Sequence, residues 1–118
     1  MSEVYRETVF AGDTTKAWEI GLVTSAPGIN PPLMAQLDGA FTCRLVVAGA
    51  DPAIARVVVT KNLANTRFIA WLTPAETLSL GKGTWTVGIE LRNAALVPPL
   101  VQEKRVVVRI EVGMVPPA

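Results

Sequence analysis

Histidine is absent from the 118 residues, and cysteine occurs once, at Cys43. The absence of histidine removes the commonest general base, the commonest metal ligand and every histidine-based catalytic triad. A single cysteine excludes an internal disulfide and any CxxC metal or redox motif. Cys43 alternates in phase with Phe41, Leu45 and Val47, and we therefore predict a small buried apolar residue rather than a nucleophile.

Charge is also scarce, because charged residues make up 18% of the chain against about a quarter in typical domains. The 11 basic and 10 acidic residues are interspersed, and the net charge is +1. This balance does not favour binding to nucleic acid or to an acidic membrane surface. The chain lacks the long apolar run of a membrane span, and its start lacks the basic and apolar parts of a signal peptide. We expect a soluble product made in a cytoplasm.

The ten carboxylates are not paired at a spacing that would join two of them on one element. Asp13, Asp38 and Asp51 occur in turns, where aspartate usually caps the backbone, although two of them could also form a loop calcium site. The stretch GKGT at 81–84 lacks the spacing and the long helix of a phosphate loop. We predict no catalytic residues, no cofactor and no metal, and we expect that the protein is not an enzyme.

Seven apolar, alternating stretches recur at about ten-residue spacing with turn signals between them. They cover residues 4–10, 16–24, 40–48, 54–61, 67–72, 84–92 and 101–113. This pattern predicts one all-β domain over residues 1–118, an antiparallel β-sandwich of immunoglobulin-like architecture. A closed barrel is the alternative.

The clearest local signal is the stretch LTPAETLSLGKGTW at 72–85. Thr73, Pro74 and Glu76 match a capping box with proline at the first helical position, and Gly81 and Gly83 end the helix after about two turns. We therefore predict one short helix near residues 74–80. The strand that follows it is aimed into the core by the alternation of aromatic and aliphatic residues after Gly83.

Two apolar runs suggest strands with well-defined inner faces. The stretch Val57–Val58–Val59 is typical of a strand covered on both faces. In the last stretch, one face is predicted to carry Val106, Val108, Ile110 and Val112. In the stretch 67–72, Phe68, Ala70 and Leu72 are predicted to face inward. Trp71 then either packs under a loop or points outward as a contact residue.

Two connections carry prolines, 25–36 and 93–100, and the first is predicted to contain no regular element. They expose apolar residues that could contact another protein, namely Leu33 and Met34 in the first and Leu96 and Val97 in the second. Free sheet edges are the other surface on which a small sandwich can dock a second chain. With Trp71, these four residues are the predicted protein-contact residues.

The turn signals also occur in a familiar order. Gly12-Asp13-Thr14 is followed by Leu37-Asp38-Gly39-Ala40, then by Leu72-Thr73-Pro74-Ala75-Glu76-Thr77-Leu78 and by Leu80-Gly81-Lys82-Gly83-Thr84-Trp85. Over roughly residues 9–112 this order resembles the small β-sandwich modules of tailed bacteriophages and prophages, and it is similar to the N-terminal domain of baseplate upper proteins.

The resemblance implies a structural protein of the virion, assembled in the bacterial cytoplasm. It implies self-association as a homo-oligomer, often a trimer, and docking to other tail or baseplate proteins, with no catalytic residues to carry over. The alternative function is a carbohydrate-binding sandwich, which would expose aromatic side chains on one face. Only one tyrosine and three tryptophans are present, and Trp18 and Trp85 are in phase with core residues.

Overall fold

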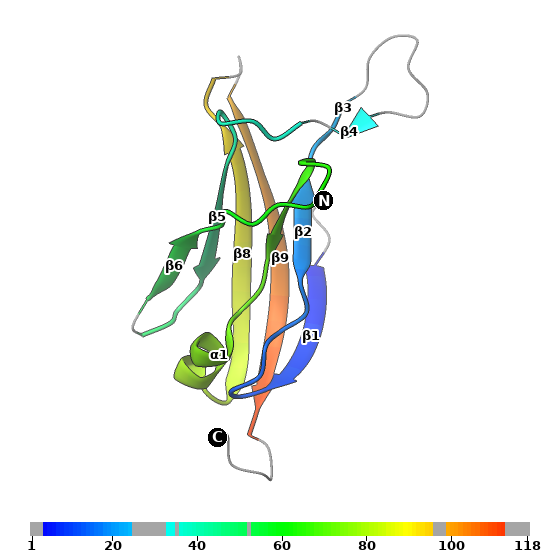
Figure 1. Cartoon of the computed structure of the whole chain (residues 1–118). Helices are drawn as coiled ribbons and strands as arrows, with labels where there is room; N and C mark the ends of the chain where they lie inside the picture. The colour runs from blue at the N-terminus through cyan, green and yellow to red at the C-terminus, as the bar shows by residue number, and fades with distance from the viewer. Residues whose placement is uncertain (1–3, 25–32, 35, 52, 96–98, 113–118) are drawn as a thin grey trace.

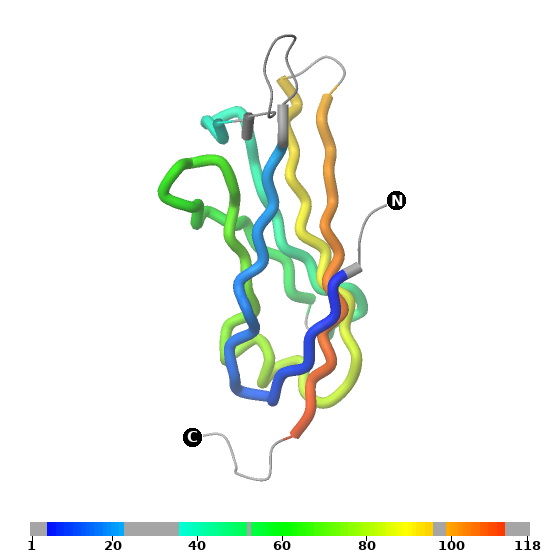
Figure 2. Tube along the Cα trace, turned by 90° about the vertical axis from the view of Figure 1, so that its right-hand side faces the viewer, coloured from blue at the N-terminus to red at the C-terminus, as the bar shows by residue number. Residues whose placement is uncertain are grey.

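The computed structural model describes residues 4–24, 33–34, 36–51, 53–95 and 99–112, which form two layers of strands and one short helix (Figures 1 and 2). The larger sheet contains, in spatial order, β1 (Val4–Phe10), β9 (Leu100–Glu111), β8 (Gly83–Asn93), β5 (Thr42–Val47) and β6 (Ile54–Val57). The second layer contains β2 (Trp18–Gly21) and β7 (Arg67–Ala70), and the helix α1 (Pro74–Leu80) connects β7 to β8.

This architecture confirms the predicted all-β sandwich. Seven of the strands in the described residues have four or more residues, as the sequence spacing indicated. The order β1-β9-β8-β5-β6 packed against β2-β7 is that of an immunoglobulin-like domain. One pairing differs from the antiparallel expectation, because β1 runs parallel to β9, with Val4 opposite Arg105 and Phe10 opposite Glu111. These strands lie at opposite ends of the chain, so no hairpin dictates their relative direction.

The predicted loop at 25–36 also differs from expectation. Leu33–Met34 forms a two-residue strand, β4, which pairs antiparallel with β3 (Val23–Thr24). The prediction that no regular element forms in this stretch was therefore wrong for these two residues. Proline removes a backbone donor and restricts its neighbours, but Leu33 and Met34 come after the two prolines, where the chain can pair again.

The core lies between the inner faces of the two layers. The predicted phases of the long strands are confirmed, because alternate residues of β5, β8 and β9 are almost fully buried. These include Cys43, Leu45, Val47, Val87, Ile89, Leu91, Val106, Val108 and Ile110. The second layer contributes Trp18, Ile20, Phe68 and Ala70, followed by Leu72. Burying these side chains is the main driving force for the fold.

Three positions that were predicted to be covered are exposed instead. Val57 and Val59 are 65% and 78% exposed, and only Val58 between them is buried. The stretch is thus not covered on both faces, because in the described residues no second layer covers the outer face of the larger sheet, where Val46 of β5 and Val101 of β9 are exposed as well. Val112 is 64% exposed because β9 ends at Glu111, one residue before it.

The capped corner after β7 forms as predicted. The Thr73 side chain accepts a hydrogen bond from Glu76 N, the Glu76 carboxylate accepts one from Thr73 N, and Pro74 is the first helical residue. Gly81 ends the helix with φ of 74°, a conformation that glycine adopts without strain. The indole of Trp85 donates to Gly81 O at 3.2 Å, which ties the start of β8 to the helix end. No helix in the described ranges is long and apolar enough to cross a membrane.

Candidate functional site

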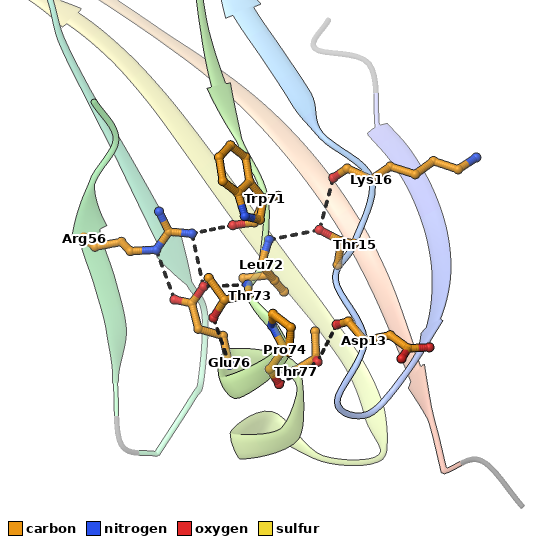
Figure 3. A network of polar contacts seen from close by, with 10 residues as sticks. All are labelled: Asp13, Thr15, Lys16, Arg56, Trp71, Leu72, Thr73, Pro74, Glu76 and Thr77. Carbon is orange, nitrogen blue, oxygen red and sulfur yellow. Dashed lines mark hydrogen bonds and ion pairs between the residues drawn. The ribbon is translucent and has the colours of Figure 1, made fainter. Parts of the chain in front are cut away.

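The turn at Gly12-Asp13 and the helix α1 are joined by one buried hydroxyl (Figure 3). Thr77 is fully buried, and its Oγ1 donates to Asp13 O at 2.7 Å and accepts a hydrogen bond from Gly12 N at 3.1 Å. Two turn signals that are more than 60 residues apart in the sequence are therefore in direct contact. Backbone groups that are withdrawn from water in a turn need such partners, and Thr77 provides one to Gly12 N and one to Asp13 O, which are only partly buried.

A second threonine joins the same segments a few residues away. Thr15 Oγ1 accepts a hydrogen bond from Leu72 N at 2.9 Å, and Thr15 N donates to Leu72 O at 3.3 Å. Thr15 is 5% exposed, and Leu72 is fully buried. These two hydrogen bonds join the segment before β2 to the segment after β7. They therefore hold the two strands of the second layer together at this end.

The helix corner is also tied to the edge strand β6. Arg56 Nε and Nη2 each donate to a different oxygen of Glu76 at 3.1 Å, and Nη2 also donates to Trp71 O (Figure 3). Glu76 is partly buried, which disfavours its charged form, but hydrogen bonds from Arg56 and Thr73 outweigh that cost. The pKa of Glu76 is therefore lowered from its usual value of 4.5.

This bidentate pair has a consequence for the surface of the protein. Arg56 is the one charged residue of β6, and its side chain is directed inward to Glu76. The pair holds β6 against the helix corner and directs the one charged side chain of β6 to the inner face, away from the exposed valines on the outer face. Planar bidentate geometry makes this a well-defined contact rather than a loose surface ion pair.

The edge of β2 is protected by side chains from the other layer. Lys104 Nζ donates to Glu19 O at 2.7 Å and also lies 4.3 Å from the centroid of the Tyr5 ring. Gln102 Nε2 donates weakly to Gly21 O at 3.5 Å. Carbonyl oxygens that another chain could bind are thus occupied, and a lysine stands at this edge, which is a common protection of free sheet edges.

Charged residues also stand at two further edges. The segment after β6 lies along β7, with Thr60 O accepting from Ile69 N, and there Lys61 Nζ donates to Leu37 O and lies 5.1 Å from the Phe68 ring centroid. On the far side of the larger sheet, β1 carries Arg6 and Glu7 at its centre. A strand that docked on either edge would approach charged side chains.

The free edge of β6 is different. In the described residues β6 pairs with β5 alone, and Figure 1 shows it at the border of the larger sheet. Val58 N donates to Cys43 O, and backbone groups alternate in direction along an antiparallel ladder. Ala55 and Val57 therefore direct their N–H and C=O groups away from β5. We call residues 55, 57 and 59 the β6 edge; it carries two exposed valines and no charge.

The predicted contact residues are not brought together with this edge. Leu33 and Met34 lie in β4, paired with β3, and Leu96 and Val97 lie outside the described residues. Trp71 is partly exposed, while Phe68, Ala70 and Leu72 claim the inner face as predicted. The backbone carbonyl of Trp71 accepts a hydrogen bond from Arg56 Nη2.

Sequence reasoning missed the β6 edge because three consecutive valines resemble an interior strand. A usable signal was present in the sequence, since Arg56 interrupts the apolar stretch between Ile54 and Val57. A charged residue within a short strand that starts just after a proline is typical of an edge rather than of a central strand.

Two hollows on the surface of the described residues do not assemble a catalytic set of residues. One, of about 340 Å³, lies on the outer face of the larger sheet near Arg6, Thr8, Thr84 and Arg109. The second, of about 270 Å³, adjoins the Lys104 contact with β2. In the part of the chain that the structure describes, no group of three or more acidic or cysteine side chains is placed to hold a metal ion. Burial raises the pKa of the Cys43 thiol to about 11.

Comparisons with known proteins do not identify a family for this chain. No protein-family model matches the chain, and no curated protein is detectably similar to it.

Proposed function

We propose that this protein is a non-enzymatic assembly module of a tailed bacteriophage or prophage, associated with the tail or baseplate, that acts through contacts between subunits. The observation that carries the proposal is the β6 edge, which exposes backbone hydrogen-bonding groups and two valines without a protecting charge. The order of turn motifs, which resembles baseplate modules, supports the tail assignment. In this role the protein is part of the virion, and it docks to its own copies and to other tail or baseplate proteins.

The physical reason is that an unprotected sheet edge is a ready template for pairing with another chain. Val57 and Val59 expose most of their surface, and within the described residues β6 pairs with β5 alone, so the outward backbone groups of Ala55 and Val57 have no strand partner there. A strand from another subunit would satisfy these groups and cover the valines at the same time. The three other edges described above carry lysine, arginine or glutamate, so the contrast within one molecule points to β6 as the docking edge.

The oligomeric state of the purified protein tests this proposal. We expect light scattering after size-exclusion chromatography to give a mass that is a multiple of the 12.6 kDa of one chain. The substitution Val57→Lys should lower the mass to that of one chain, because an exposed lysine opposes edge pairing.

The matched control is Val101→Lys, since Val101 is a valine of similar exposure, 57%, on the outer face of the same sheet. It should leave the oligomer unchanged. A wild-type protein that remains a monomer at high concentration would contradict the proposal. Circular dichroism should confirm that both variants are folded.

The alternative function as a carbohydrate-binding module is not favoured by the positions of the tryptophans. Trp18 is 7% exposed, and its indole donates to Glu7 Oε1 at 3.1 Å. The indole of Trp85 is engaged with Gly81 O. Trp18 is buried and Trp85 packs against the core, so neither ring presents a free face on which a sugar could stack. Trp71 by itself would offer only a small stacking surface.

A further inference from the structure

We propose that the partner at the β6 edge is the same edge of a second copy, paired antiparallel about a two-fold axis that passes beside Val57. This inference rests on the proposed function and names the partner and symmetry of that site. It predicts a dimer rather than the trimer that the resemblance to baseplate modules suggests. The two larger sheets would join into one continuous sheet of ten strands.

The choice of a second β6 edge follows from the charges on the other edges. A trimeric ring requires a heterologous contact, in which β6 of one copy meets a different edge of the next. The edge of β2 is blocked by Lys104, the edge beside β7 carries Lys61, and β1 carries Arg6 and Glu7. A β6 edge that docked on one of these three edges would either displace a hydrogen bond of Lys104 or Lys61 or place its valines against charged side chains. Two β6 edges bring no charge of their own together.

The register is restricted by the direction of the backbone groups. The backbone groups of Ala55 and Val57 point outward, and Val59 continues this alternation just past the end of β6, since Val58 N still bonds to Cys43 O; pairing must therefore place members of this set opposite one another. A two-fold axis beside Arg56 would set the two Arg56 side chains face to face, and although each is paired with its own Glu76, like charges directly opposite one another are unfavourable. An axis beside Val57 instead places Arg56 opposite the partner's Val58 and avoids that repulsion.

The same register also brings the exposed apolar side chains together. Val57 lies opposite the partner's Val57, and Val59 lies opposite the partner's Ala55, all on the outer face of the sheet. The most exposed apolar surface of β6 is thereby covered. The contact between Arg56 and Glu76 is on the inner face and stays intact.

Cysteine substitutions test the register directly. Residues opposite each other in a hydrogen-bonded pair have Cα atoms about 5.5 Å apart, within the range of roughly 4.4–6.8 Å that a disulfide spans. We therefore expect the substitution Val57→Cys to give a disulfide-linked dimer on mild oxidation, seen on a non-reducing gel. Cys43 is buried, so it should not contribute.

Val59→Cys is the matched control because Val59 is even more exposed than Val57. In this register the two copies of residue 59 are separated by more than about 13 Å, so this variant alone should remain uncross-linked. A mixture of Ala55→Cys and Val59→Cys chains should cross-link, since those residues face each other. This pattern separates a defined pairing from the chance collision of exposed thiols.

The outcomes distinguish the two proposals. A dimer that cross-links through residue 57 and through the 55–59 mixture supports the two-fold pairing. A trimer, or a dimer in which residue 57 does not cross-link, overturns the two-fold pairing while assembly as a function stands. A protein that is monomeric at every concentration and is not cross-linked in any variant overturns both.

Discussion

Replacing Thr77 by valine tests whether the buried hydroxyl holds the two turns together. Valine keeps the branched shape and nearly the volume of threonine, so no cavity forms in the core. The change removes the hydrogen bond donated to Asp13 O and the one accepted from Gly12 N. Both backbone groups then lose their protein partner.

The expected loss of stability follows from these two bonds. A neutral hydrogen bond contributes about 1 kcal/mol net, and a buried group left without a partner costs about 1–3 kcal/mol. Gly12 is half-buried and Asp13 is exposed, so water can reach them in part. We expect Thr77→Val to lower the free energy of unfolding by about 2 kcal/mol, a large share of the ~5–15 kcal/mol of a typical domain.

Urea denaturation followed by tryptophan fluorescence measures this change. Thr77→Ser is the informative comparison, because it keeps both hydrogen bonds and loses one methyl group, at about 1 kcal/mol. Ser79→Ala, an exposed position on the same helix, should change stability by less than about 0.5 kcal/mol. If Thr77→Val proves no more destabilising than Thr77→Ser, the hydroxyl does not hold the corner and the reasoning fails.

Two further predictions concern Glu76 and Cys43. Because the pKa of Glu76 is lower in the folded chain than in the unfolded chain, its stabilising contribution is present above pH 4.5 and is lost as the pH falls through the folded pKa. Urea midpoints across this range should therefore fall less in Glu76→Gln than in the wild type, and parallel curves would contradict this. Cys43, with a pKa near 11, should resist a thiol reagent at about pH 8 until urea is added, whereas rapid labelling of the native protein would show that it is accessible.

Local signals predicted the features that depend on neighbouring residues. The capping box from Thr73 to Glu76 and the glycine that ends the helix formed as expected, because their hydrogen bonds join residues only three or four apart. The alternation along β5, β8 and β9 predicted the core, since a strand with one buried face must alternate. The sandwich class followed from the number and spacing of such strands.

Sheet order and edges depended on contacts between distant segments. The parallel pairing of β1 with β9 joins the two ends of the chain, and no turn signal encodes it. Similarly, the hydrogen bonds of Thr77 with Gly12 and Asp13 place two turn motifs side by side. The residues of each motif, read alone, do not indicate that the other motif is its neighbour. The motif order suggested a relationship to tail proteins, and the geometry supplies a physical reason for the two turns to occur together.

The β6 edge shows the division most clearly. The sequence alone determined that residues 57–59 are apolar and that a strand reaches them, because three valines favour extended backbone; β6 ends at Val57. Whether they face the core or the solvent was decided only by the tertiary structure, which places β6 at the border of the sheet and turns Arg56 inward to Glu76. The physical reason is that burial depends on which elements cover each face of the sheet, and that information is distributed over the whole chain.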